Sequence, residues 1–285
     1  MKSDPLTHRL EFAVEVAWRA GRATLAHFQT GTTTVETKAD RTPVTAADRA
    51  AERLARELID DRFPGDGVLG EEYGAARPNA RHRWVIDPID GTRSFVHGVP
   101  LYAVLIALER DGEPVLGVIH MPALDETVFA ARGEGCWWDG RRASVSDVAR
   151  LEDATVVTTD AEAIVAAGRA AGWDRLRART GLVRTWGDAY GYALVATGRA
   201  EAMLDPVLAR WDAAPLGPIV EEAGGVFTAR QESPGGPVEH VVATNAALAG
   251  AVRSLIAPTA AGFAHGASSS SDARSERTEP EEAGP

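Results

Sequence analysis

The sequence WVIDPIDGT, residues 84–92, joins an apolar run to two carboxylates three residues apart and ends in Gly-Thr. The apolar run predicts a buried strand. Pro88 keeps Asp87 out of the helical region, so we expect the chain to leave the sheet where the acids begin. Asp87 and Asp90 would then converge, and their mutual repulsion requires a cation between them. Hard carboxylate oxygens suit Mg²⁺, which commonly binds beside phosphate.

Gly91 and Thr92 extend this prediction toward an anion. Gly91 lets the backbone approach a phosphate, and the amides of the following turn could hold phosphate oxygens together with the Thr92 hydroxyl. An alternative interpretation is an ordinary turn, because Asp, Pro and Gly are common turn residues and Asp often caps a helix. Other parts of the chain discriminate between the two.

Two further segments carry acids at the ends of predicted elements. Residues 70–74, GEEYG, follow the apolar pair Val68 and Leu69 and place Glu71 at a strand end. Residues 211–216, WDAAPL, place Asp212 at a helix start, where capping of free amides is the alternative role. Neither segment is diagnostic by itself.

In combination these segments resemble the inositol monophosphatase family of Mg²⁺-dependent phosphomonoesterases. The matching signatures occur in the family's order. In chain order they are TPVTAAD at 42–48, GEE at 70–72, DPIDGT at 87–92, and WD at 211–212 with EAGG at 222–225. FVHGVP at 95–100 continues the resemblance after the Gly-Thr of the second acid motif. The resemblance covers roughly residues 6 to 256, and several ordered motifs are far more specific than one.

The resemblance implies roles for individual residues. The metal ligands would be Glu71, Asp87, the Ile89 carbonyl, Asp90 and Asp212, holding two or three Mg²⁺ ions. The expected catalytic residues are Asp48, Thr92 and Asp90. Thr92 would orient the attacking water and donate a hydrogen bond to Asp48, and the leaving group would be protonated near Asp90 and Asp212.

Residues 184–192, RTWGDAYGY, with ATGRAE at 196–201, most resemble the histidinol-phosphatase branch. The inositol enzymes carry a Gly-Ser-Thr-Ala run here and a Glu seven residues before the Trp-Asp acid, where this chain has Asp188 and Asp205. Acids at these positions suit a substrate with a cationic end, such as L-histidinol phosphate. The predicted substrate contacts are Glu71, Ile89, Asp90, Gly91, Thr92, Arg184, Gly187, Asp188, Asp205 and Asp212.

Simpler roles remain open for three of these residues. Asp188 could cap a helix beginning near Ala189, Asp205 could close a strand before Pro206, and Arg184 could be a surface salt-bridge residue. The alternative functions are an inositol-1-phosphate phosphatase or a bisphosphate nucleotidase, and, more distantly, a non-catalytic binding protein on the same scaffold.

Composition narrows the class of protein. The 285 residues carry a formal net charge of −11, which argues against a nucleic-acid partner because phosphate backbones require a basic surface. The first residues lack a signal peptide's apolar core, and no apolar run reaches the roughly 20 residues of a membrane span, so we expect a cytoplasmic protein. The expected partner is a small phosphorylated metabolite, and the family resemblance implies a homodimer.

Periodicity predicts an α+β protein, and the resemblance implies a layered α-β-α-β-α sandwich of the inositol monophosphatase and sugar phosphatase type. One domain would span 1–260, with an α+β half at about 1–145, an α/β half at about 146–260, and a disordered acidic tail at 261–285. We expect Pro218 to bend the helix after Asp212. The predicted helices are 6–28, 46–63, 162–171 and 189–197, and the predicted strands are 101–108, 114–120, 127–130, 156–158, 181–184 and 200–204.

Overall fold

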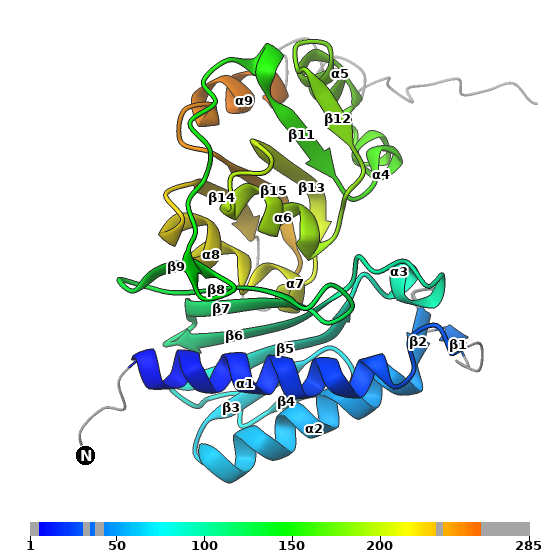
Figure 1. Cartoon of the computed structure of the whole chain (residues 1–285), viewed down its shortest axis with the longest axis vertical. Helices are drawn as coiled ribbons and strands as arrows, with labels where there is room; N and C mark the ends of the chain where they lie inside the picture. The colour runs from blue at the N-terminus through cyan, green and yellow to red at the C-terminus, as the bar shows by residue number, and fades with distance from the viewer. Residues whose placement is uncertain (1–5, 31–34, 38–42, 232–235, 258–285) are drawn as a thin grey trace, which may run out of the picture.

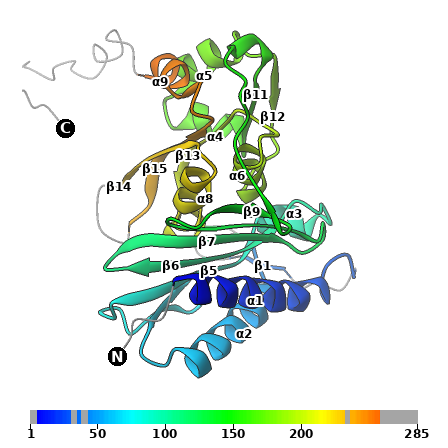
Figure 2. The same cartoon turned by 60° about the vertical axis from the view of Figure 1, so that its left-hand side comes forward.

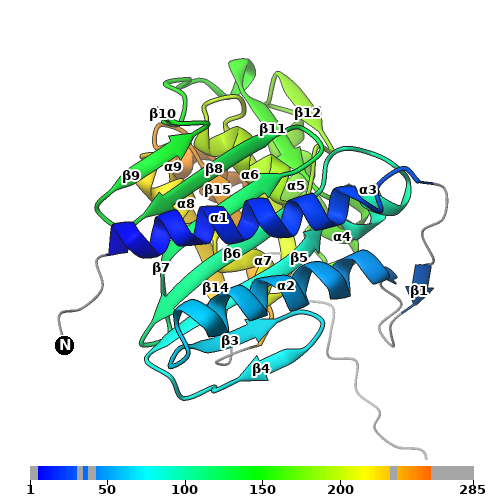
Figure 3. The same ribbon diagram turned by 60° about the horizontal axis from the view of Figure 1, so that its bottom comes forward.

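The computed structural model describes residues 6–30, 35–37, 43–231 and 236–257. Helices α1 (Leu6–Leu25) and α2 (Ala46–Arg62) form the first layer and lie side by side on one face of a large sheet (Figure 3). They form where the sequence repeats apolar residues at helical spacing. The repeating residues, including Ala51, Ala55 and Ile59 of α2, are buried against the sheet. Thr45 caps α2, accepting a hydrogen bond from the Ala47 amide.

The large sheet has eight strands in the order β10-β9-β8-β7-β6-β5-β3-β4. The pairing is antiparallel except between β3 and β5, and the strands predicted at 101–108, 114–120 and 127–130 form three neighbours in it, β6, β7 and β8. A separate two-stranded ribbon pairs β1 (Val35–Thr37) with β2 (Pro43–Thr45). The eight strands are β3 (Gly67–Gly70), β4 (Gly74–Ala76), β5 (His82–Asp90), β6 (Ala103–Arg110), β7 (Glu113–Met121), β8 (Glu126–Ala131), β9 (Gly135–Trp138) and β10 (Arg141–Arg142).

The second sheet has five strands in the order β12-β11-β13-β15-β14. Strand β11 is parallel to both its neighbours, whereas β15 is antiparallel to β13 and β14. Short helix α3 (Thr92–Val96) and a 3₁₀ turn (Leu151–Asp153) lie in the connections. The strands are β11 (Thr155–Thr158), β12 (Leu182–Arg184), β13 (Ala202–Leu208), β14 (Val226–Gln231) and β15 (Val238–Thr244).

Helices fill the space between the sheets and cover the outer face of the second one (Figures 1 and 2). The middle layer contains α6 (Ala189–Ala196), α7 (Arg210–Ala213) and α8 (Leu216–Glu222), and the outer layer contains α4 (Ala161–Ala166), α5 (Ala170–Arg177) and α9 (Ala249–Ile256). One core cluster joins Ile119 of the large sheet, Ile219 of α8 and Met203 of the second sheet. The predicted layered α-β-α-β-α fold is confirmed.

Two helix predictions were wrong in detail. The single helix expected at 162–171 is divided into α4 and α5, because Gly168 adopts a φ of +73° that a continuing helix cannot contain. The bend expected at Pro218 occurs instead at Pro215, which separates α7 from α8. Pro218 lies in the first turn of α8, where an amide would have no helical carbonyl partner, so it costs no helical hydrogen bond.

The acidic tail predicted to be disordered, residues 261–285, lies outside the described residues, as does Thr42 of the TPVTAAD motif. Among the helices that the structure describes, none is both long enough and apolar enough to cross a bilayer.

Candidate active site

A bulge in β5 brings Asp87 and Asp90 to one side of the strand. Asp87 pairs with Leu105 of β6 and Asp90 with Ala103, so three steps along β5 face two along β6. Residues three apart in a regular strand point to opposite faces, and the extra residue restores the same face. The strand therefore continues through Asp90, which corrects the expectation that the chain leaves the sheet at the first acid. Pro88 lies in the irregular part, where a missing N–H is tolerated.

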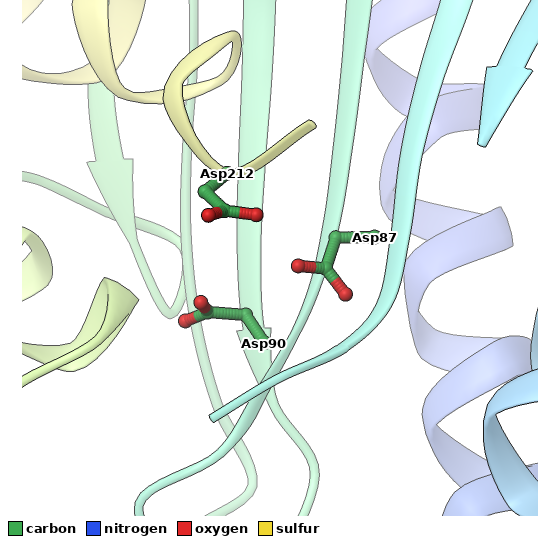
Figure 4. A group of neighbouring side chains, drawn as sticks. All are labelled: Asp87, Asp90 and Asp212. Carbon is green, nitrogen blue, oxygen red and sulfur yellow. The ribbon is translucent and has the colours of Figure 1, made fainter. Parts of the chain in front are cut away.

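Asp212 completes the cluster from the other half of the molecule. It lies in the first turn of α7, and its Oδ2 accepts a hydrogen bond from the Ala209 amide at 3.0 Å. One carboxylate oxygen from each of Asp87, Asp90 and Asp212 lies within 4.8 Å of the other two. Figure 4 shows the three carboxyl groups around a common space, two from the β5 side and one from α7.

Burial and mutual repulsion dominate the electrostatics of this cluster. Burial, followed by the charges of Glu71, Asp212 and Asp90, raises the pKa of Asp87 well above its ordinary value. Burial, followed by the charges of Asp188 and Asp212, does the same to the pKa of Asp90. Burial raises the pKa of Asp212 to about 6. Convergent hard oxygens whose negative charges oppose one another fit a small divalent cation such as Mg²⁺.

Glu71 approaches the cluster from the loop after β3. Its backbone amide donates to the Ile86 carbonyl at 3.3 Å, which fixes the loop beside β5, and Glu71 lines a cavity that it shares with Asp87, Asp90 and Asp212. The loop is also held by Glu52 of α2, a fully buried carboxylate that accepts the amides of Glu72 at 2.7 Å and Tyr73 at 3.2 Å. Gly70 permits this contact, because a Cβ there would lie 2.0 Å from Glu52 Oε1.

Sequence reasoning did not identify Glu52. The available signal was its position four residues after Asp48, which places both acids on one face of α2 beside the Glu71 loop. An acid on the buried face of a helix, where an apolar residue is expected, indicates a carboxylate that accepts hydrogen bonds from backbone amides.

Asp48 and Thr92 are not hydrogen-bonded to each other, which corrects the predicted contact. The Thr92 hydroxyl donates to the Ile89 carbonyl at 2.9 Å, because Thr92 begins α3 one turn after that carbonyl. Asp48 Oδ2 accepts the amide and hydroxyl of Thr45, at 2.8 and 2.6 Å. Asp48 Oδ1 is buried without a hydrogen-bond partner among the described residues. Burial raises the pKa of Asp48 to about 6.

A cavity of about 650 Å³ opens beside the acids. Gly91 and Thr92 line the wall near β5, and Gly187 and Asp188 line the facing wall. The two walls meet closely, since a Cβ on Gly91 would lie 2.9 Å from Asp188 Oδ2. Gly91 itself has a φ of +80° and precedes α3, whose first amides have no helical carbonyl partner.

Asp188 has an unusual backbone conformation, with φ at 53° and ψ at −156°. It precedes α6, but its side chain makes no capping hydrogen bond, so the simple capping role is not what the structure shows. Its amide instead donates to the Thr159 hydroxyl at 2.8 Å. Burial raises the pKa of the Asp188 carboxyl to about 6, and the charge of Arg93 opposes that rise. Such strain at a cavity wall is typical of functional sites.

The structure places Asp205 in the lining of the cavity and Arg184 outside it. Asp205 lines the cavity, but its oxygens accept the Thr159 amide at 3.1 Å and the Tyr192 hydroxyl at 2.9 Å, so it fixes the wall that carries Asp188. Burial raises its pKa to about 7. Arg184 is exposed at the end of β12, where its guanidinium donates to the Val183 carbonyl at 2.7 Å. Arg184 does not line the cavity, because its strand carries it outward.

In the absence of a divalent cation, we expect the free energy of unfolding to fall as pH rises from about 4 to about 7. The pKa of Asp212 is about 6 in the folded protein against an ordinary 3.8. The folded state therefore binds more protons than the unfolded state in this interval. For Asp212 alone the difference corresponds to at most about 3 kcal/mol.

Melting curves recorded with a chelator and with saturating Mg²⁺ measure this effect. The cation should restore stability chiefly at the alkaline end, where the carboxylates are charged. Equal stabilisation by Mg²⁺ at about pH 5 and about pH 8 would contradict the expectation.

A model of the inositol monophosphatase family matches residues 6–265, and the chain belongs to that family. Its relatives include a histidinol-phosphatase from Chlorobaculum parvum, 49% identical over 220 residues that cover 77% of this chain and 85% of the relative. A histidinol-phosphatase from Mycobacterium tuberculosis is 40% identical over 244 residues, covering 84% and 94%. The solved structure of an inositol monophosphatase from Thermotoga maritima matches with a TM-score of 0.78 and 30% identity, covering 87% of this chain and 96% of that one.

Proposed function

We propose that this chain is a Mg²⁺-dependent phosphomonoesterase that hydrolyses L-histidinol phosphate to L-histidinol and phosphate. The observation that carries the proposal is the Asp188 carboxylate, which is half-buried in the cavity wall beside Gly91 and makes no capping bond. A substrate that carries an ammonium group and an imidazole can pair with such a carboxylate, whereas inositol offers only hydroxyls. The similarity to two histidinol-phosphatases supports the same assignment.

The proposed reaction uses the residues as the structure arranges them. Asp87, Asp90 and Asp212, joined by Glu71 and the Ile89 carbonyl, would hold the metal. Bound Mg²⁺ would offset the phosphate charge and make a nucleophile of water near neutral pH. We propose two or three ions, as the family resemblance implies.

The remaining groups would position the substrate and the attacking water. The first amides of α3 and the Thr92 hydroxyl would bind phosphate oxygens. Asp48 presents a buried Oδ1 without a hydrogen-bond partner among the described residues, and this atom would accept a proton or hydrogen bond from the water that attacks phosphorus. Asp188 would hold the cationic end of the substrate, so that the phosphoester lies at the acids.

Phosphate release from L-histidinol phosphate, myo-inositol 1-phosphate and adenosine 3′,5′-bisphosphate tests the proposal directly. With Mg²⁺, we expect kcat/KM for histidinol phosphate to exceed the others by about 100-fold, equivalent to about 2.7 kcal/mol of transition-state discrimination. A preference for the inositol ester would support the inositol phosphatase alternative, and equal activity on all three would contradict selectivity by Asp188.

Replacing Asp188 with asparagine keeps the shape of the wall and removes the charge. We expect kcat/KM for histidinol phosphate to fall by about 10- to 100-fold, the value of one charge-assisted hydrogen bond. Glycerol 2-phosphate, which has no cationic group, serves as the matched control substrate, and its kcat/KM should change little. A parallel loss on both substrates would show that Asp188 supports the site as a whole.

A homodimer and a cytoplasmic location stay predictions from the family resemblance and from composition. Sedimentation of the full chain at several concentrations tests the first, and fractionation of the producing cells tests the second.

A further inference from the structure

Helix α7 has only four residues, Arg210–Ala213, yet it carries Asp212. A helix of one turn is unstable alone, so its position depends on contacts with the rest of the protein. Trp211 of α7 and Ala214, which follows it, pack on Val85 and Ala107 of the large sheet. Apolar contact of this kind is non-directional, so it holds α7 against the sheet without fixing its rotation.

Hydrogen bonds to a buried carboxylate fix the orientation of α7. Glu109 of β6 has a fully buried side chain, and its Oε1 accepts Arg210 Nε at 2.8 Å and also Arg210 Nη2. The Arg210 side chain is only 14% exposed, and its Nη2 also donates to the Gly112 carbonyl at 3.1 Å. Two nitrogens of the planar guanidinium therefore donate to one carboxylate oxygen, and this geometry fixes both the position and the orientation of the Arg210 side chain.

The other oxygen of Glu109 binds a second arginine. Glu109 Oε2 accepts Arg83 Nε at 2.7 Å and Arg83 Nη2 at 2.5 Å. Arg83 is the register partner of Glu109 across β5 and β6, and β5 is the strand that carries Asp87 and Asp90. A single buried carboxylate thus connects the strand bearing two acids of the cluster with the helix bearing the third.

We propose that Arg210, held by Glu109, is a positioning residue that sets Asp212 at the distance from Asp87 and Asp90 needed to bind a divalent cation. The inference deepens the proposed function and rests on the acid cluster being its metal site. It assigns different roles to two arginines that share one carboxylate. Arg210 controls the metal affinity, whereas Arg83 contributes to stability alone.

The variants Arg210→Met and Arg83→Met test this assignment. Methionine keeps most of the apolar stem in each case and removes the guanidinium. Isothermal titration calorimetry of the full chain with Mg²⁺ alone, without substrate, measures the affinity directly. We expect Arg210→Met to raise the Kd for Mg²⁺ about tenfold, which is typical of residues that orient metal ligands, and Arg83→Met to change it less than about twofold.

Kinetics give an independent measurement. In Arg210→Met the Mg²⁺ concentration for half-maximal phosphate release should rise in parallel with the Kd, while kcat at saturating Mg²⁺ falls less. Arg210→Lys, which keeps the charge without the planar fork, should also weaken Mg²⁺ binding and serves if the methionine variant does not fold.

Equal shifts of Mg²⁺ affinity in the two arginine variants, or no shift in either Arg210 variant, would overturn the proposal and leave a pair of structural ion pairs. Calorimetry without substrate separates the two hypotheses. A wrong substrate leaves these results unchanged, whereas a wild-type protein that binds no Mg²⁺ would overturn both.

Discussion

Replacing Asp87 with asparagine is expected to reduce kcat/KM for phosphoester hydrolysis by at least about a thousandfold, with the fold intact. Asp87 is 2% exposed and faces both Asp90 and Asp212, so its loss removes one of the three carboxylates of the cluster. The amide preserves size and can still accept the Ile89 backbone hydrogen bond that Asp87 Oδ1 accepts at 3.0 Å.

The same variant should be more stable than the wild type when no divalent cation is present. Burial, followed by repulsion from Glu71, Asp212 and Asp90, raises the pKa of Asp87, and asparagine removes both costs of the charged carboxylate. A melting curve with a chelator should therefore move to higher temperature. Asp61→Asn, at an exposed acid of α2, is the matched control and should change neither quantity. Substantial turnover by Asp87→Asn at saturating Mg²⁺ would contradict the assigned metal site.

Replacing Gly117 with alanine is expected to destabilise the protein by about 1 to 3 kcal/mol or more and to lower its Mg²⁺ affinity. Gly117 lies in β7, where a Cβ would sit 2.1 Å from the Pro215 carbonyl oxygen. That backbone atom joins α7 to α8 and cannot move without moving both helices. The displacement would carry Asp212 away from Asp87 and Asp90.

Gly250→Ala is the matched control, since Gly250 lies in α9 with no atom within 4 Å of an added Cβ. Alanine there should stabilise the helix by up to about 1 kcal/mol. Chemical denaturation and Mg²⁺ titration of both variants measure the contrast. If Gly117→Ala and Gly250→Ala behaved alike, the close approach at Pro215 would not determine the position of α7.

The parts of the fold that follow from periodicity were predictable. Helices α1 and α2 and the antiparallel strands of the large sheet each show a local apolar pattern that survives in the structure. The acid cluster was predictable because its motifs are contiguous. The ends of helices at a glycine or proline were harder to predict, because the apolar pattern continues across the breaks at Gly168 and Pro215.

The contacts that orient the cluster were not predictable, because they join residues distant in the sequence. Glu52 accepts backbone amides of the loop that carries Glu71, and Glu109 pairs with an arginine 101 residues away in the sequence. Arg184, in contrast, was predicted to contact the substrate but lies outside the cavity. Its motif context indicated a substrate contact, but the direction of a strand side chain depends on register that the sequence does not specify.

The bulge in β5 means that the facing of Asp87 and Asp90 depends on how the strand pairs as well as on the two acids themselves. Regular pairing of the same residues with β6 would turn Asp90 to the opposite face, because side chains three positions apart in a regular strand point in opposite directions. A substitution that favours regular pairing at the two intervening positions would therefore separate the two carboxylates without changing either of them.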